Sequence, residues 1–122
     1  MPDFLIEYNL EEILESIDII NQRLKDINKP DDFMITPFGT TLFDSIVMRL
    51  QTIGERIKNI DKKNANFLKR FTEVQWNDII RLRDLISHHY ENVNPTIVFD
   101  ICNNKLPTLK IMIEKMLKEF KK

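Results

Sequence analysis

The sequence predicts an all-α fold, an antiparallel bundle of four to five helices with short connections. Apolar residues recur at the i, i+3, i+4, i+7 spacing of amphipathic helices along most of the chain, and no strand-like alternation persists. The 122 residues include only two glycines and five prolines, which are few breakers for a turn-rich β fold. With 43% hydrophobic residues the chain can bury a core of its own, so residues 1–122 are expected to form one domain.

The first expected helix carries an apolar stripe between residues 10 and 27. The stripe comprises Leu10, Ile13, Leu14, Ile17, Ile20, Leu24 and Ile27. Asn9 is placed to cap this helix, and Glu12 lies where the partner in a capping box belongs. Segment 28–32 is expected to end the helix, because Pro30 disfavours helical conformation at the residue before it.

A second helix is expected from Thr36, which can act as the cap, with Pro37 at its first helical position. Its apolar stripe comprises Leu42, Phe43, Ile46, Val47, Leu50, Ile53, Ile57 and Ile60. Gly54 lies inside this helix and costs about 1 kcal/mol against alanine. Close packing of another helix against Gly54 would justify that cost.

Three further helical segments complete the expected bundle. A short helix is expected within 64–71, and a longer one is opened by Thr72 or Glu73 and closed by segment 92–95. The last segment, 95–121, contains Pro107, which predicts a kink or break near Lys105. Cys102 lies among apolar neighbours in this segment and is predicted to be a small core residue.

Composition narrows the class of protein. The formal net charge of −1 gives no general basic surface for nucleic acid. A single cysteine excludes an internal disulfide and a cysteine-built zinc site, and it suits a reduced cytoplasm. The start, MPDFLIEYNLEE, lacks the basic and apolar regions of a signal peptide, and no apolar run approaches the ~18 residues of a membrane span. A cytoplasmic protein without membrane contact is predicted.

Both histidines stand together in the stretch RLRDLISHHYENV, residues 81–93. On a regular helix of about 100° per residue, one face is shared by Arg83, Ser87 and Tyr90. Asp84 and His88 are four residues apart, a spacing at which a carboxylate can fix the tautomer of a histidine and favour its protonated form. His89 points about 100° away from His88, so the two histidines do not form a natural metal pair. No metal or cofactor is predicted.

Arginine and histidine without a metal suit one reaction in particular. Arginine clamps phosphate oxygens and histidine transfers protons near neutral pH, so together they suit cleavage of RNA by its own 2′-hydroxyl group. Arg83 and His88 lie about 140° apart on an ideal helix. They meet if the helix end unwinds, or if two copies of the chain each contribute one of them to a shared cleft. In the plain alternative, these residues are surface charges, polar residues of a fraying helix end and a core aromatic.

The same residues read R-x4-H-x-Y, from Arg83 through His88 to Tyr90, and this pattern resembles the signature of the HEPN superfamily in its HepT-like toxin branch. Asp84 stands where asparagine is commoner, and His89 stands where a small or acidic residue is usual. Four flanking segments also resemble the family: NLEEILESIDII (9–20), IGERIK (53–58), EVQWNDIIRLRD (73–84) and LPTLKIMIEKML (106–117). The likeness therefore spans about residues 9–118.

The resemblance implies a dimeric helical bundle with a metal-independent endoribonuclease site between two motif copies. Arg83 and His88 would be the catalytic pair, with Asp84 as a polar support. It also implies a toxin of a type VII-like toxin–antitoxin pair, whose nucleotidyltransferase (MNT-type) antitoxin transfers AMP onto Tyr90. Glu55 matches the family's glycine–glutamate element, but a mid-helix glutamate is most often solvated, and no catalytic role is predicted for it.

Two other functions stay open at the level of sequence. The same bundle can be a binding module with weak or absent activity, acting as partner or nucleotide-binding subunit of the nucleotidyltransferase. It can also be a purely structural dimer. The net charge of −1 fits a restricted RNA substrate, a tRNA or mRNA site, better than general RNA binding.

Overall fold

The computed structural model describes residues 4–120, and within that range the chain is helical with no strand. The helices are α1 (Phe4–Arg23), α2 (Pro37–Lys63), α3 (Ala65–Lys69), α4 (Trp76–His88), α5 (Pro95–Asp100) and α6 (Leu106–Lys118). Short 3-10 turns occupy Leu24–Asp26, Pro30–Phe33 and Tyr90–Asn92, and a π-helical turn, Ile101–Lys105, joins α5 to α6. The predicted all-α bundle is confirmed, and α5, the π turn and α6 together form its last, broken helix.

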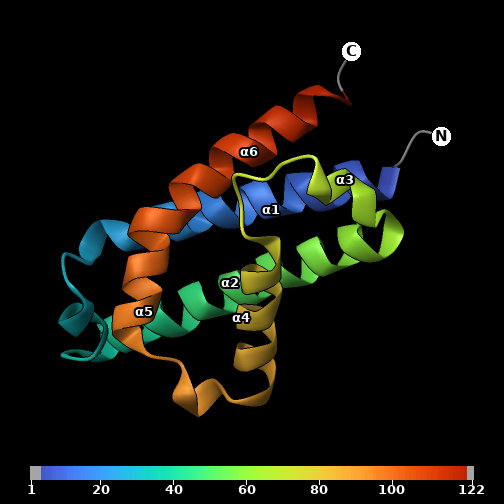
Figure 1. The fold of residues 1–122 in the computed structure, drawn as a ribbon. Coiled ribbons are helices and arrows are strands. Elements are labelled where there is room, and N and C mark those ends of the chain that lie inside the picture. The colour runs from blue at the N-terminus through green and yellow to red at the C-terminus, as the bar shows by residue number, and fades with distance from the viewer. Residues whose placement is uncertain (1–3, 121–122) are drawn as a thin grey trace.

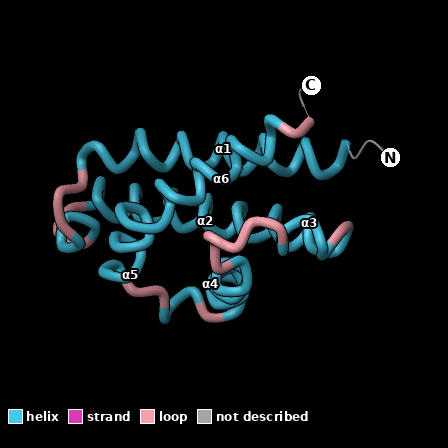
Figure 2. The backbone as a smooth tube through the Cα atoms, turned by 45° about the horizontal axis from the view of Figure 1, so that its top comes forward, coloured by secondary structure: helices cyan, strands magenta, loops and turns pink. Residues whose placement is uncertain are grey.

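The long helix α2 is the centre of the bundle, because α1 packs on one side of it and α4 on another. Helix α6 packs on α1, so the apolar stripes of α1, α2 and α6 close around a common core. Figure 1 shows α4 in front of α2 and crossing it obliquely, with α5 to the left of α4. Figure 2 shows the same arrangement with α4 seen nearly end-on beneath α2.

Helix α1 starts earlier than the sequence prediction placed it. Asn9 is not a cap: it lies inside the helix, is buried, and its side-chain Nδ2 donates to the carbonyl oxygen of Leu5 at 2.7 Å. The prediction was wrong because the apolar stripe continues upstream through Ile6, which is buried one turn before Leu10. The α-helix also ends at Arg23, before the predicted segment 28–32.

Helix α2 begins as predicted. The hydroxyl oxygen of Thr36 accepts a hydrogen bond from the backbone nitrogen of Gly39 at 2.9 Å, with Pro37 in the first turn. The structure also shows the close packing that would justify Gly54. A Cβ atom added there would lie 2.3 Å from the Cβ of Arg83, so only glycine lets α4 approach this closely.

Helix α4 is shorter than predicted. It begins at Trp76, whose indole nitrogen donates to the carbonyl oxygen of Phe71 at 2.9 Å, and it ends at His88. His89 leaves helical geometry with φ −142° and ψ 51°, and Tyr90 starts a separate 3-10 turn. The expected start at Thr72 or Glu73 and the expected end in segment 92–95 are therefore corrected.

The last helical segment is interrupted where the sequence predicted. Pro107 has no N–H and its ring clashes with the carbonyl of the preceding turn, so regular α-helix cannot continue through it. The chain accommodates this with the π turn Ile101–Lys105. Cys102 lies in that turn and is buried, as predicted for a core residue, and its burial raises the pKa of the thiol to about 12.

Candidate functional site at the seam between helices α2 and α4

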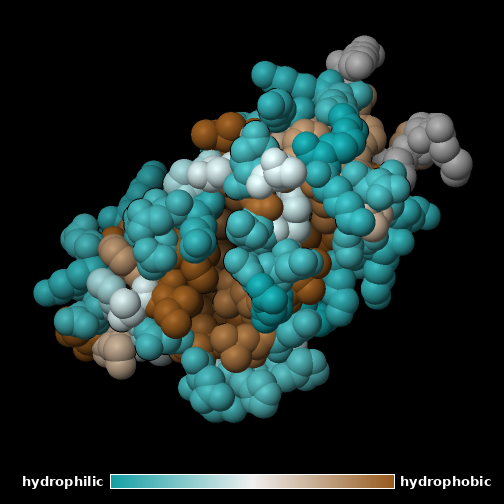
Figure 3. Space-filling model, in the orientation of Figure 1, coloured by the Kyte–Doolittle hydropathy of each residue, from teal (hydrophilic) through white to brown (hydrophobic). Residues whose placement is uncertain are grey.

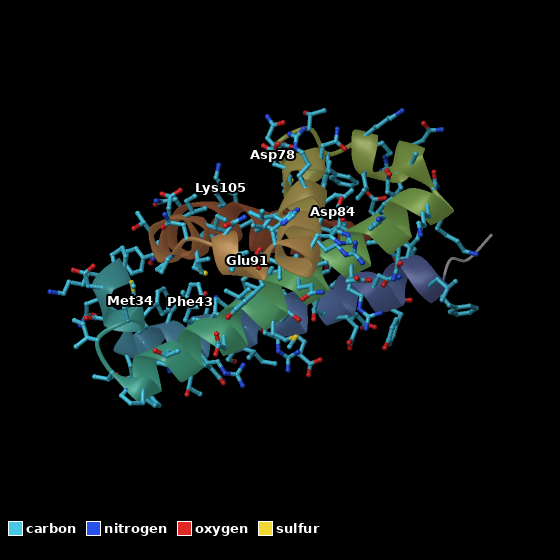
Figure 4. The ribbon with its side chains drawn as sticks, turned by 90° about the horizontal axis from the view of Figure 1, so that it is seen from below. Met34, Phe43, Asp78, Asp84, Glu91 and Lys105 are labelled. Carbon is cyan, nitrogen blue, oxygen red and sulfur yellow. The ribbon has the colours of Figure 1, made fainter. Side chains whose placement is uncertain are left out.

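Polar side chains form a continuous line of contacts where α4 and the turn after it lie against α2. We call this line the α2–α4 seam. Its four contacts are Arg83 with Glu55, Asp84 with Lys58, Ser87 with Gln51, and Tyr90 with Asp44. The α2 members lie at 44, 51, 55 and 58, which places them on one helical face. In Figure 4, Asp84 lies on the α2 side of α4, and Lys105 lies across from the other side.

Arg83 is the most constrained side chain of the seam. Its Nε donates to Oε1 of Glu55 at 2.8 Å, and its Nη2 donates to the same oxygen. Its Nη1 donates to Oδ1 of Asp84 at 2.8 Å. The side chain is only 20% exposed, and the hydrogen bonds to Glu55, then to Asp84, raise the pKa of Arg83 above its usual value. The guanidinium is therefore a fixed charge with a set orientation.

Asp84 supports Arg83 and is shared with Lys58. The hydrogen bond from Arg83 is the main reason why the pKa of Asp84 lies below its usual value, and Lys58 at 4.0 Å adds to this effect. The interaction between Asp84 and His88 is weaker than predicted. His88 adds to the electrostatic stabilisation of the Asp84 carboxylate, but no hydrogen bond or ion pair joins the two within residues 4–120.

His88 is the last residue of α4 and is exposed. In the part of the chain that the structure describes, no hydrogen bond or ion pair connects it to Arg83, which points toward α2. The neighbouring His89 faces Glu91, with Nδ1 3.9 Å from the carboxylate oxygen. Within residues 4–120, Arg83 is therefore held by contacts with Glu55 and Asp84, and no direct contact joins it to His88.

Tyr90 has left α4 but still reaches α2. Its hydroxyl donates to Oδ1 of Asp44, and burial, followed by this hydrogen bond, raises the pKa of Tyr90 to about 12. Ser87 accepts a hydrogen bond from Nε2 of Gln51 at 2.9 Å. The predicted common face of Arg83, Ser87 and Tyr90 is thus preserved toward α2, although Tyr90 reaches it from a 3-10 turn and not from the helix.

An apolar cleft of about 370 Å³ lies beside the seam, between α2, α4, α5 and the start of α6. Its apolar walls include Ile53, Ile79, Leu82, Ile97 and Leu106, and Glu73, Asp78, Asp100 and Lys105 are among its polar lining residues. Figure 3 shows the hollow as a brown, hydrophobic surface surrounded by hydrophilic residues. The cleft and the seam therefore use different faces of the same helix.

Within residues 4–120, no group of three or more histidine, cysteine, aspartate or glutamate side chains is arranged to hold a metal ion. No helix in the described range combines the length and the apolar character needed to cross a membrane.

A protein-family model described as ribonuclease HepT-like matches residues 13–116 of this chain. The chain belongs to the ribonuclease HepT-like family. This match confirms the family resemblance found in the motif and its flanking segments. The helical bundle, with the arginine motif on α4, is consistent with the HEPN-like fold predicted from that resemblance.

Relatives agree with the family assignment. A candidate RNase of Caldanaerobacter subterraneus is 31% identical over 112 residues, which cover 92% of this chain and 94% of that protein. A protein of Thermococcus cleftensis named probable ribonuclease HepT is 30% identical, with coverage of 89% and 93%. A gamma-glutamylcyclotransferase and candidate RNase of Methanocaldococcus jannaschii is 30% identical over 117 residues. The chain spans 50% of that last protein and 60% of another candidate RNase of the same organism. No solved structure matches the chain.

The HepT-like motif residues were found from sequence, but their partners on α2 were not. Glu55 was expected to be solvated, yet it binds Arg83 from 28 positions away. No role was predicted for the other three polar residues of this line, Asp44, Gln51 and Lys58. A signal was present, because the polar residues 44, 51, 55 and 58 recur at helical spacing beside the apolar stripe of α2. Such a polar line on a long helix indicates a second helix with complementary side chains.

Proposed function

We propose that residues 1–122 form one HepT-like domain that acts as a metal-independent endoribonuclease toxin in the cytoplasm. The observation that carries the proposal is the state of Arg83. Three contacts fix its guanidinium, yet one N–H on Nη1 and one on Nη2 have no acceptor within residues 4–120. A rigid arginine with two outward donors matches the fork geometry by which arginine binds phosphate.

The reaction that suits this site is attack of the RNA 2′-hydroxyl on the adjacent phosphodiester. One base removes the 2′-OH proton, the new P–O bond closes a 2′,3′-cyclic phosphate, and the 5′-oxygen leaves with a proton from an acid. His88 is the proton-transfer group, and Arg83 stabilises the negative charge that builds on the phosphate oxygens. DNA lacks the 2′-hydroxyl and is not a substrate by this route.

The active site is proposed to form between two copies of the chain. His88 is exposed at the end of α4 and Arg83 is directed toward Glu55 of α2, so a second copy can supply the histidine that faces the arginine. The apolar cleft beside α4 supports this arrangement, as does exposed Ile97, because contiguous apolar surface is typical of protein contact sites. The homodimer then holds each arginine opposite the histidine of the other copy.

A nucleotidyltransferase antitoxin is the proposed partner, and AMP on Tyr90 is the proposed means of neutralisation. Tyr90 is 44% exposed and lies in the same seam as Arg83, so its hydroxyl is within reach of a modifying enzyme. An attached AMP adds a negative phosphate and a bulky nucleoside beside the place where RNA phosphate must bind. Both charge and size then block the substrate, which we propose is a restricted tRNA or mRNA site.

The test compares two adjacent histidines. Purified wild-type protein, His88→Ala and the matched control His89→Ala are incubated with total cellular RNA in excess EDTA. Wild type and His89→Ala are expected to cut and to leave cyclic phosphate ends, whereas His88→Ala loses about 10²-fold or more in rate, as is usual when a general acid or base is removed. Equal loss in both histidine variants, or dependence on added metal, would contradict the proposal.

One observation favours a second function, that of a binding module without activity. The positive charge of Arg83 is already matched by the carboxylates of Glu55 and Asp84, which weakens its attraction for RNA phosphate. If wild type and His88→Ala are both dimeric and neither cuts RNA, we conclude that the protein is a binding module without activity. The protein is then the partner of the nucleotidyltransferase, and Tyr90 modification is the next property to assay.

A further inference from the structure

The contact between Glu55 and Arg83 does more than join two helices. We propose that Glu55 is a positioning residue of the RNA site, which holds the Arg83 guanidinium for the reaction at the expense of weaker phosphate binding. This inference rests on the proposed ribonuclease function. Glu55 itself does not touch the reacting atoms in this scheme and acts only through the arginine.

One turn of α2 fixes both ends of the Arg83 side chain. Gly54 leaves room for its stem, since a Cβ on Gly54 would lie 2.3 Å from the Cβ and 3.0 Å from the Cγ of Arg83. The next residue, Glu55, accepts hydrogen bonds from Nε and Nη2 at the head of the same side chain. A long arginine normally samples many rotamers, and here the adjacent glycine and glutamate select one.

The edge of the guanidinium that Glu55 occupies determines which edge is left for RNA. Glu55 takes the side formed by Nε and Nη2, and Asp84 takes one N–H of Nη1. One N–H on each of Nη1 and Nη2 has no acceptor within residues 4–120, and arginine binds phosphate oxygens through such N–H groups, which form parallel hydrogen bonds. Without Glu55, the guanidinium can rotate and present any edge.

Charge makes the same contact unfavourable for RNA binding. The formal charges of Arg83 and Lys58 are cancelled by those of Glu55 and Asp84. Glu55 is 42% exposed, so its carboxylate is partly open to the solvent from which an RNA phosphate approaches and repels that phosphate. Glu55 is therefore expected to affect binding and the chemical step in opposite directions.

The decisive variant is Glu55→Gln, which removes the charge with little change in size and weakens both hydrogen bonds from Arg83, because both end on one oxygen of Glu55 and a neutral amide oxygen is a poorer acceptor. We expect RNA to bind about 2- to 5-fold more tightly, because one repelling charge is gone. We expect the single-turnover rate constant to fall about 10- to 100-fold, because the arginine is held less firmly in its reactive orientation. Loss of folding alone would weaken binding and rate together, so the opposed signs distinguish the two causes.

Two more variants separate charge from geometry. Glu55→Asp keeps the charge but is shorter by one methylene, so the rate should fall while the affinity stays within about twofold of wild type. Glu12→Gln is the matched control, since Glu12 pairs with Arg56 at 3.6 Å between α1 and α2, outside the seam. It should leave both affinity and rate unchanged. The probe is a labelled RNA oligonucleotide that carries the strongest cut site in total RNA, with a 2′-deoxy version at that site for affinity.

An NMR measurement tests the positioning without relying on activity. In ¹⁵N-labelled wild-type protein, the Nε–H signal of Arg83, assigned by its loss in Arg83→Lys, should exchange slowly with water because it is bonded to Glu55. Exchange should become faster in Glu55→Gln, whose acceptor has no charge, and in Glu55→Asp, whose acceptor is drawn back by one methylene. Equal protection in wild type and both variants overturns the inference, as does an unchanged cleavage rate in Glu55→Gln. If wild type does not cut RNA at all, the proposed function fails, and the NMR result alone decides whether Glu55 positions Arg83.

Discussion

Helix α2 is held from two sides in two different ways. On the α1 side, four side chains of α1 are fully excluded from solvent: Leu10, Ile13, Ile17 and Ile20. On the α4 side, α4 contributes one buried residue, Ile86 at 4% exposure, together with half-buried apolar residues and the polar pairs of the seam. The first contact is apolar and needs no particular alignment, whereas the second depends on individual donors, acceptors and charges.

Because different kinds of contact hold α1 and α4 to α2, the bundle can keep its fold while the site is altered. Burial of apolar area supplies most of the stability of a small domain, and here that area lies mainly between α1, α2 and α6. Helix α4 carries the motif but adds little to that core. Elements with few buried apolar contacts open at lower free energy than the core, so we expect α4 to be the more easily displaced helix.

The largest effect on the free energy of unfolding is expected from the apolar contact between α1 and α2. Ile17→Ala should lower the free energy of unfolding by about 3 kcal/mol, because it leaves a cavity where no solvent reaches. Ile79→Ala, at a half-buried position on α4, should lower it by only about 1 kcal/mol. Urea denaturation followed by circular dichroism measures both. Equal losses at the two positions would mean that α4 is as firmly packed as α1.

Gly54→Ala should produce the next largest effect, because α4 lies close to the backbone of α2 at this glycine. The added methyl group collides with the Cβ of Arg83, so the helices must separate, at about 1–3 kcal/mol, which exceeds the ~1 kcal/mol that alanine gains in helix propensity. Hydrogen exchange should rise mainly in α4, whose docking is disturbed, and little in α1.

Asn59→Ala is the control for that substitution, because Asn59 is an exposed residue on the same helix. It should leave the stability unchanged or raise it slightly through helix propensity. If Gly54→Ala behaves like Asn59→Ala, then α4 can shift away from α2 freely, and the seam does not constrain Arg83.

The sequence was sufficient for features that depend on one helix at a time. The cap at Thr36 and the break near Pro107 follow from local rules and are both confirmed, whereas the close packing at Gly54 needed the structure. The family likeness of the motif was also readable, because it depends on the spacing of a few residues within α4. Local periodicity and turn chemistry carry this information without any knowledge of tertiary contacts.

The remaining features depend on a second segment or on where a helix stops. Glu55 was taken as solvated because nothing in its own helix indicates a partner 28 residues later. Tyr90 was placed on α4 because a regular helix was assumed, whereas the backbone of His89 ends it one residue earlier. Asn9 was read as a cap because its residue type favours that position, but the burial of Ile6 extends the helix upstream. In each case, tertiary packing overrode a local preference.

The smallest effect should come from the end of the seam, where Tyr90 donates to Asp44. The pKa of Tyr90 is raised from 10.0 to about 12 in the folded protein, so the folded chain holds this proton more tightly than the unfolded chain. The stability that this contact contributes is complete below pH 10 and is lost as the pH rises through about 12. Its size should be less than about 1 kcal/mol, because Tyr90 is 44% exposed and solvent screens the contact.

Tyr90→Phe isolates this contribution from the lysines that titrate over the same range. The difference in unfolding free energy between wild type and Tyr90→Phe should therefore shrink as the pH is raised from about 8 to about 11.5. A difference that stays constant, or that grows with pH, would show that Asp44 does not hold the Tyr90 proton. The seam would then end at Ser87, and the 3-10 turn that carries Tyr90 would be docked on α2 by packing alone.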